Sequence, residues 1–338
     1  MFDKEIGIDL GTANTLVYMK GKGIIMREPS VVAIDVRTQE VRCVGSDAKE
    51  FIGRTPGSIV AVRPLKDGVI ADFEVAAEML RQFIQKSCKK GLFSKVHVAI
   101  CVPSGVTRVE RLAVRRAALK AGAKAPVIVI EEPLAAAIGA GLPVEDASGS
   151  MVLDIGGGTS EVAVISMNGI VAKKSVRVGG DEFDQAIVDY VKRKYNLLIG
   201  DRTAEEAKIA IGSAFPYENE GEYAVRGRNL LDGLPKTVTL QAKEIREALA
   251  DSLDAILDAV RTTLEVIPPE LSADIIDRGL TLTGGGALLR GLDQLLSKET
   301  GISVHVAQNP LDCVAIGTGL VLNNRAIQET VAAEELAD

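Results

Sequence analysis

Hydrophobic and polar positions follow the same short pattern at two places in the chain. Residues 6–18 read IGIDLGTANTLVY, and residues 152–164 read VLDIGGGTSEVAV. Each segment contains an apolar strand that ends in an aspartate, then a glycine-containing turn with a threonine, then a second strand with β-branched residues. That pattern is typical of a β-hairpin. Two such hairpins in one chain indicate a duplicated domain.

Further strands and helices are predicted after each hairpin. In the first half we expect a strand at residues 96–102 and a helix at 108–121. In the second half we expect a strand at 169–178 and a helix at 182–195, where apolar residues recur at helical spacing. Three more segments complete the pattern: an alanine-rich helix at 134–140 after Pro133, a long helix at 242–264, and a strand at 279–283 that leads through a glycine cluster into another helix.

These elements predict an α/β fold with two lobes, each carrying a smaller inserted subdomain. A chain of 338 residues is long enough for two lobes with separate cores. We place lobe I at residues 1–145, with its core at about 1–30 and 71–145 and an insertion at about 31–70. Lobe II spans 146–322, with its core at about 146–179 and 237–322 and an insertion at about 180–236. A C-terminal helix and tail occupy 323–338, and we expect the acidic end at 334–338 to be frayed.

Composition narrows the class of protein. Hydrophobic residues make up 47% of the chain and charged residues 25%, as in soluble globular proteins. The net charge of −7 argues against a nucleic-acid partner, because neutralising phosphates needs a basic surface. The four cysteines are scattered, which is typical of thiols in a reducing compartment. Charges at Asp3, Lys4 and Glu5 interrupt any signal peptide, and no apolar stretch approaches the length of a membrane span. We therefore expect a cytoplasmic protein.

The two hairpin turns carry the residue types that ATP with Mg²⁺ requires. Glycine allows close approach to phosphate, and successive N–H groups in a tight turn form an anion-binding nest. Mg²⁺ keeps several waters and takes one or two carboxylates, which Asp9 and Asp154 would provide through bound water. The phosphates would be held from opposite sides by the turn residues Thr12, Ala13 and Asn14 and by Gly156, Gly157, Gly158 and Thr159.

A single turn of this kind would be read as a tight hairpin turn and nothing more. Two matched turns and a third glycine cluster at 283–288 favour a nucleotide, because the helix predicted after that cluster could direct its N-terminus at a phosphate or ribose. The chain has no G-x-x-x-x-G-K-[ST] motif, which excludes a P-loop protein. It also has no G-x-G-x-x-G that opens a helix, which disfavours a dinucleotide enzyme.

Several motifs of the chain resemble those of a known family. The segments DLGTANT (9–15), VPSGVTRVER (102–111), IEEPLAAAIGAGL (130–142), DIGGGTSEV (154–162) and TGGGALLRG (283–291) resemble the motifs of the actin, Hsp70 and sugar-kinase superfamily. The motif sequences are most similar to those of the bacterial actin-like MreB family. Further segments agree with that family: GRTPG (53–57), RPLKDGVIADFE (63–74), YNLLIGDRTAE (195–205), RGRNLLDGLPKT (226–237) and NPLDCVAIGTG (309–319). The resemblance implies a duplicated actin-like (RNase H-like) ATPase fold.

The resemblance also assigns roles to residues. It implies that Glu132, before a proline, orients the water that attacks the γ-phosphate, with Thr159 as second hydrolysis residue. The sequence alone does not exclude the neighbouring Glu131, and either glutamate could be an ordinary acidic residue at a helix N-terminus. For the base and ribose the resemblance points to Glu205 and Lys208, which could otherwise be a solvated helical pair. These two would face the third glycine cluster, with Gly285, Gly286, Ala287 and Leu288.

The segment 86–95 is locally basic and contains the adjacent apolar residues Leu92 and Phe93 at a predicted loop tip. Burying two such side chains in a bilayer gives roughly 1.5–3 kcal/mol each, and each nearby lysine adds about 1 kcal/mol at an anionic leaflet. Many copies in a filament would multiply this weak binding. The alternative is a loop whose Leu92 and Phe93 fold back onto the core. Since the MreB family is membrane-associated, the resemblance implies contact with the inner face of the cytoplasmic membrane.

Three classes of protein share this nucleotide fold. An Hsp70-like chaperone would need a β-rich peptide-binding domain after residue 319, and a sugar kinase would need a substrate pocket with an aspartate base; we identify neither. We therefore expect a filament that extends by heterologous contacts between copies of the chain, in paired protofilaments. The resemblance implies slow hydrolysis of bound ATP as an assembly switch, and membrane proteins of the cell-wall elongation machinery as partners in maintaining rod shape.

Overall fold

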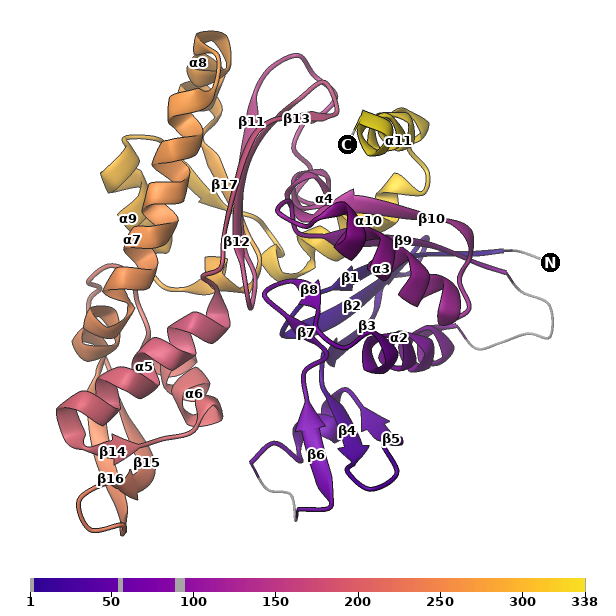
Figure 1. Cartoon of the computed structure of the whole chain (residues 1–338). Helices are drawn as coiled ribbons and strands as arrows, with labels where there is room; N and C mark the ends of the chain where they lie inside the picture. Colours follow the sequence, from indigo (N-terminus) through magenta and orange to yellow (C-terminus); the bar gives the residue numbers. More distant parts are fainter. Residues whose placement is uncertain (1–2, 54–56, 89–94, 338) are drawn as a thin grey trace.

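Two five-stranded mixed sheets with the same strand order build the two lobes (Figure 1). The computed structural model describes residues 3–53, 57–88 and 95–337. In lobe I the sheet order is β3 (Gly23–Pro29), β2 (Asn14–Met19), β1 (Lys4–Leu10), β9 (Val96–Val102) and β10 (Lys124–Glu131). In lobe II it is β13 (Gly169–Val176), β12 (Ser160–Ser166), β11 (Ser150–Ile155), β17 (Leu280–Thr283) and β18 (Val304–Val306).

Pairing directions in the two sheets are also equivalent. Strand β1 is antiparallel to β2 and parallel to β9, and β11 is antiparallel to β12 and parallel to β17. Each central strand is apolar and buried along most of its length, as expected where a sheet is covered on both faces. Asp9 and Asp154 stand next to last in these two strands, so equivalent ends of the two sheets present equivalent carboxylates. The predicted duplicated α/β fold is confirmed.

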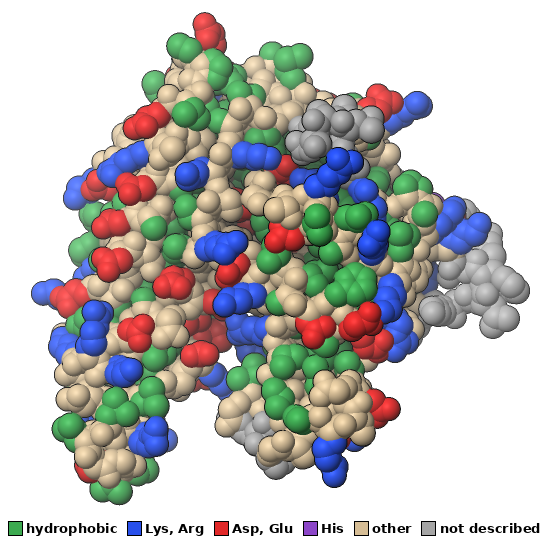
Figure 2. Space-filling model, viewed as in Figure 1, with side chains coloured by type: hydrophobic (Ala, Val, Ile, Leu, Met, Phe, Trp, Pro, Cys, Tyr) green, Lys and Arg blue, Asp and Glu red, His purple; other side chains and the backbone are tan. Residues whose placement is uncertain are grey.

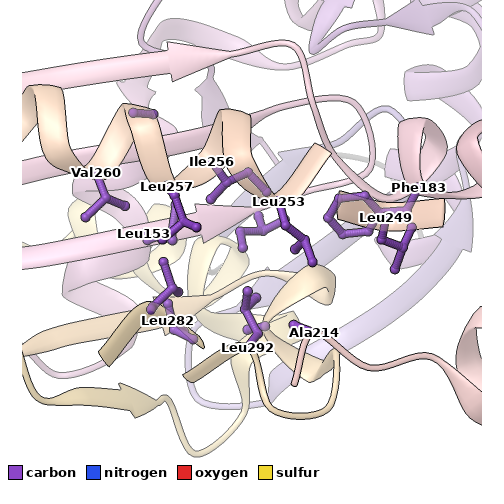
Figure 3. Packing of buried hydrophobic residues seen from close by; sticks show 14 of the residues in the cluster. Leu153, Phe183, Ala214, Leu249, Leu253, Ile256, Leu257, Val260, Leu282 and Leu292 are labelled. Carbon is purple, nitrogen blue, oxygen red and sulfur yellow. The ribbon is translucent and has the colours of Figure 1, made fainter. Parts of the chain in front are cut away.

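Helices cover the outer faces of both sheets. On lobe I these are α2 (Phe73–Ser87) and α3 (Arg108–Lys120), and on lobe II α7 (Ala242–Val266), α8 (Pro269–Arg278) and α9 (Leu292–Thr300). Local sequence sets where they begin. Thr107 and Glu110 form a reciprocal capping box at the start of α3, and Gln241 and Glu244 do the same for α7. In lobe II, leucines and isoleucines of α7 meet Leu153 and Leu282 of the sheet (Figure 3).

Each lobe carries a smaller unit at the lower edge of Figure 1. The lobe I unit consists of β4 (Val32–Asp35), β5 (Val41–Val44), α1 (Ser46–Lys49) and β6 (Ile59–Val62), followed by the short hairpin β7 (Leu65–Lys66) and β8 (Val69–Ile70). The lobe II unit consists of α5 (Gly180–Tyr195), β14 (Leu197–Leu198), α6 (Asp201–Ile211), β15 (Glu222–Asn229) and β16 (Pro235–Gln241). Strand β16 continues past residue 236, where we had placed the end of the insertion.

Two buried helices lie between the sheets and join the lobes. They are α4 (Glu132–Gly139) and α10 (Cys313–Val321), and they pack on each other within an apolar cluster to which both sheets contribute. Their backbones are in direct contact. A Cβ at Gly317 would lie 1.8 Å from the carbonyl oxygen of Ala135, so only glycine fits at this position. The remaining elements are η1 (Gly285–Leu288), η2 (Pro310–Asp312) and α11 (Arg325–Ala337).

Most predicted elements agree with the structure to within two residues, and two predictions need correction. The glycine cluster after β17 leads into a single 3₁₀ turn, η1, and the α-helix α9 begins only at Leu292. The acidic end that we expected to be frayed continues α11 as far as Ala337. Leu92 and Phe93 lie outside the described residues. Of the helices that the structure describes, none has the length and apolar character needed to cross a membrane.

Candidate functional site

A cavity of about 430 Å³ lies between the two lobes, and residues of both lobes line it. It contains both hairpin turns, the start of α4, the N-terminal part of α5, part of α6 and the third glycine cluster. On the face shown in Figure 2 the molecule is hollowed between its two lower arms, with charged side chains on both sides of the hollow. The structure therefore brings together segments that are far apart in the sequence.

The first turn links β1 to β2 and places Thr12, Ala13 and Asn14 at the cavity. Thr12 is buried, and its hydroxyl oxygen accepts a hydrogen bond of 2.8 Å from the backbone N–H of Gly68. Gly68 is the second residue of the β7–β8 turn and also lines the cavity. The hairpin turn of the inserted unit is thereby fixed against the first turn.

The second turn links β11 to β12 and places Gly156, Gly157, Gly158 and Thr159 at the cavity. It is closed by a 2.8 Å hydrogen bond from the Gly156 N–H to the Thr159 carbonyl oxygen. The two turns touch each other across the lobes. A Cβ at Gly157 would lie 2.7 Å from that of Ala13, which is closer than side-chain atoms approach. The absence of a side chain at residue 157 is therefore what allows the lobes to approach this closely.

Asp9 and Asp154 point into the same cavity from opposite lobes. Removal from water, and then the nearby Asp154 carboxylate, raise the pKa of Asp9 to about 7. Removal from water raises the pKa of Asp154 to about 6, although a hydrogen bond from Thr283 opposes this shift. A cation bound between the two facing carboxylates would offset the free-energy cost of ionising them. Two carboxylates, with water as the remaining ligands, form a donor set of the kind that Mg²⁺ takes in proteins. Among the described residues no group of three or more His, Cys, Asp or Glu side chains is placed to hold a metal ion.

The structure distinguishes the two adjacent glutamates. Glu132 is the first residue of α4, is 8% exposed and lines the cavity. Its burial, together with the charges of Glu161, Asp9 and Asp154, raises its pKa well above the usual range. Glu131 instead makes ion pairs with Arg111 at 3.2 Å and with Lys173 at 2.8 Å. Of the two, Glu132 is therefore the one placed to act in the cavity.

The opposite wall of the cavity contains the residues predicted for the base and ribose. Glu205 and Lys208 of α6 both line it, and so do Gly285, Gly286 and Leu288. The Lys208 ammonium is held by the Asp184 carboxylate at 2.8 Å and the Gly180 carbonyl oxygen at 2.9 Å. Ala287 differs from the prediction, because its side chain is buried in the lobe II core and does not line the cavity.

Several lining residues were not predicted from the sequence. They include Gly68, Asp181, Asp184, Ile209, Arg290 and Leu311. The Asp67-Gly68 pair between two short apolar runs is a recognisable hairpin signal and could have indicated Gly68. The aspartates at 181 and 184 follow Gly179-Gly180 at the start of a helix, which could also have been noticed. Arg290 lies in the TGGGALLRG motif (283–291), two residues after the predicted Leu288, and that proximity could have indicated it.

Two lobes of one topology, joined by buried helices and presenting paired acidic turns to one cavity, define an actin-like fold. Comparison with solved structures agrees. The chain superposes on a structure of a MamK double helical filament with a TM-score of 0.81 at 19% identity, covering 96% of this chain and 99% of that one. MreB5 of Spiroplasma citri, in a structure bound to AMPPNP, gives a TM-score of 0.91 at 38% identity, covering 99% of each chain.

The chain belongs to the MreB/Mbl family, whose model matches residues 3–330. It is 56% identical over 324 residues to the cell shape-determining protein Mbl of Bacillus subtilis (strain 168), covering 96% of this chain and 97% of the relative. It is 57% identical over 327 residues to the cell shape-determining protein MreB of Escherichia coli (strain K12), covering 95% and 94%. The family resemblance predicted from the motifs is confirmed.

The raised pKa values of the two aspartates can be measured directly. In the protein without nucleotide or metal, ¹³C-carboxyl NMR should show Asp9 titrating near pH 7 and both Asp154 and Asp184 near pH 6, each protonated at lower pH. Asp154→Asn and Asp184→Asn variants assign the two resonances near pH 6. Because the Asp154 charge contributes to the shift of Asp9, Asp154→Asn should lower the pKa of Asp9. If the resonances assigned to Asp9 and Asp154 titrated below about pH 5, the close pairing of these buried carboxylates would be wrong.

Proposed function

We propose that this protein binds ATP with Mg²⁺ between its lobes, hydrolyses it slowly, and assembles in response into actin-like filaments at the cell membrane. The observation that carries the proposal is the single cavity in which Asp9, Asp154 and Glu132 meet the two glycine turns. Family membership favours a filament over the sugar kinases and chaperones of the superfamily. MreB5 of Spiroplasma citri has been solved with AMPPNP and with ADP, which supports a nucleotide in the equivalent cavity here.

The cavity has a polar end and an apolar end, as ATP does. At the polar end the backbones of the two turns, from Thr12 to Asn14 and from Gly156 to Gly158, would donate N–H groups to the phosphates. At the other end Ile209, Leu288 and Leu311 line the cavity while 68%, 56% and 47% exposed. Large apolar side chains left open to solvent around a cavity favour a flat apolar ligand group, here the adenine. Glu205 and Lys208 lie beside them and would bind the ribose.

Asp9 and Asp154 would hold Mg²⁺ through bound water. Both carboxylates face the cavity, and the raised pKa of each fits a site that is completed by a cation. When bound, Mg²⁺ neutralises negative charge on the phosphates. The protein's part is then to keep the two aspartates facing each other across the lobes.

Glu132 and Thr159 would orient the attacking water. They come from different lobes, Glu132 from the start of α4 and Thr159 from the second turn, and both are nearly buried. A polar side chain in a site sheltered from bulk water can hold one water in line with the γ-phosphate. Because the two residues belong to separate lobes, their arrangement depends on how far the lobes are closed, and hydrolysis can therefore report lobe closure.

Replacing Glu132 tests this role. We expect Glu132→Ala to bind ATP normally and to release phosphate about a hundredfold more slowly, because the orienting group is lost. Glu131→Gln is the matched control and should retain phosphate release, since Glu131 pairs with Arg111 and Lys173 away from the cavity. Fluorescent-nucleotide binding and phosphate release are the two measurements. Normal phosphate release from Glu132→Ala would refute the assignment.

Lobe II has apolar side chains exposed at its two opposite poles, as a filament subunit requires. At the tip of the β15–β16 hairpin Leu231 is 79% exposed, and at the other pole Ile276 of α8 is 69% exposed (Figure 1). The net charges at the two poles are opposite. Basic residues outnumber acidic ones in the hairpin, which carries Arg226, Arg228 and Lys236 with Glu222 and Asp232, and acidic residues predominate near α8, where Glu265, Glu270, Asp274 and Asp277 accompany Arg278. One subunit's hairpin would therefore fit against the next subunit's α8, which is a heterologous contact that extends without closing.

This contact predicts an assembly defect. Leu231→Glu and Ile276→Glu should each raise the protein concentration needed for ATP-dependent sedimentation by about tenfold, because a charge would enter an apolar contact between subunits. Leu231→Met keeps the apolar surface and should sediment like the parent protein. Sedimentation of both glutamate variants at the parent's concentration would exclude these poles as the contact.

We further propose that the filament binds the inner face of the cytoplasmic membrane through Leu92 and Phe93, and there organises cell-wall synthesis with membrane proteins of the elongation machinery. Support comes from the apolar pair in a basic segment and from relatives named as cell shape-determining proteins. Rod-shape maintenance would follow from a filament that positions wall synthesis.

Liposome pelleting tests the membrane contact. The double variant Leu92→Ser, Phe93→Ser should lose most pelleting with vesicles that contain anionic lipid, because the apolar contribution to binding is removed. It should still sediment with ATP in the absence of lipid, which serves as its internal control for folding and assembly. Unchanged pelleting would rule out this contact.

A further inference from the structure

The Asp154 carboxylate accepts a hydrogen bond from a hydroxyl group that lies outside the cavity lining. Thr283 donates a hydrogen bond of 2.7 Å from its Oγ1 to Oδ1 of Asp154, and both side chains are almost fully buried. The two residues are direct partners in the parallel pairing of β11 with β17. Thr283 does not line the cavity, so it would touch Asp154 without touching a bound nucleotide.

The Asp9 carboxylate is held at the equivalent place by a thiol. Cys101 is a free, buried cysteine whose Sγ donates to Oδ1 of Asp9 at 3.5 Å. In the parallel pairing of β1 with β9, Ile8 lies opposite Ile100, so Asp9 and Cys101 follow at the next position. Cys101 is likewise not part of the cavity lining.

Each lobe thus places one side-chain hydrogen-bond donor beside its turn aspartate, a hydroxyl in lobe II and a thiol in lobe I. In each sheet the strand parallel to the central strand supplies one donor to the aspartate at the turn. A hydroxyl is a good donor, and hydrogen bonds to charged acceptors are strong, whereas a thiol is a weak donor. The 3.5 Å separation is ordinary for a sulfur donor, so the difference between the lobes lies in the weaker S–H donor and not in the distance. Asp154 is therefore held firmly in one orientation, and Asp9 only loosely.

We propose that Thr283 is a positioning residue for the metal site that fixes Asp154, whereas the weak thiol donor Cys101 leaves Asp9 free to adjust as the lobes close. This inference rests on the proposed Mg²⁺–nucleotide site. Partners that orient metal-facing side chains commonly change metal affinity by about 10–100-fold when they are removed. A merely structural role would instead lower stability and leave the dependence on Mg²⁺ unchanged.

The experiment measures how Mg²⁺ slows the release of a fluorescent ADP from the full chain. Thr283→Val keeps the side-chain shape and removes the donor, and we expect it to raise the Mg²⁺ concentration for half-maximal slowing by about tenfold or more. Thr283→Ser restores the hydroxyl and should return that concentration to within about threefold of the parent's. Thr263→Val is the matched control, because Thr263 is equally buried and bonds only a backbone carbonyl oxygen in α7.

The cysteine arm tests the asymmetry between the lobes. Cys101→Ala should shift the same Mg²⁺ concentration by less than about threefold, with Cys88→Ala as the buried-cysteine control. A shift as large as that of Thr283→Val would overturn the asymmetry. An unchanged Mg²⁺ concentration in Thr283→Val, with normal Mg²⁺ dependence in the parent, would overturn the positioning role. Absence of any Mg²⁺ dependence in the parent would instead overturn the metal site on which the inference rests.

Discussion

The structure depends on two like charges that are held facing each other. Asp9 and Asp154 stand next to last in equivalent strands of two equivalent sheets and line one cavity. Burial raises the pKa of both carboxyls, and the Asp154 charge raises that of Asp9 further. A cation with a phosphate ligand would supply the compensating charge and would also join the lobes. Under the proposed function, lobe closure and ligand binding would then be a single equilibrium, which is the property that a nucleotide-controlled assembly switch needs.

The rest of the fold keeps those two turns in place while allowing the lobes to move. Helices α4 and α10 pack backbone against backbone between the sheets, so the lobes share one buried connection. Other contacts cross the lobes through side chains. Glu161 of β12 accepts a 3.0 Å hydrogen bond from the Ser104 N–H of lobe I, and Glu131 pairs with Lys173 of lobe II. Such polar contacts can exchange partners as the angle between the lobes changes, whereas the packed helices resist separation.

The features that could be predicted from the sequence are those determined by residues close together along the chain. The duplicated hairpins were visible because strand alternation and turn glycines occupy consecutive positions, and the two aspartates followed from them. The motif resemblance identified Glu132, but only the fold separated it from Glu131, because the difference lies in the side-chain direction at the start of α4. The 3₁₀ turn η1 and the burial of Ala287 were missed, since a glycine cluster allows several backbone paths and packing selects one.

Contacts between distant segments could not be predicted in the same way. Thr283 and Cys101 are unremarkable residues in apolar strands, and their positions beside the two aspartates appear only when parallel strands are paired in register. The apolar end of the cavity could not be predicted from the sequence either, because Ile209 and Leu311 come from separate elements that only the fold brings together.

Asp9 and Asp154 would act on one shared metal–nucleotide ligand. A double-mutant cycle tests it, using the affinity for ADP with Mg²⁺ measured by calorimetry for the parent, Asp9→Asn, Asp154→Asn and the double variant. Because both carboxylates would act on the same ion, the loss in the double variant should fall short of the summed single losses by at least about 1 kcal/mol. Strictly additive losses, or no loss in either single variant, would contradict the claim.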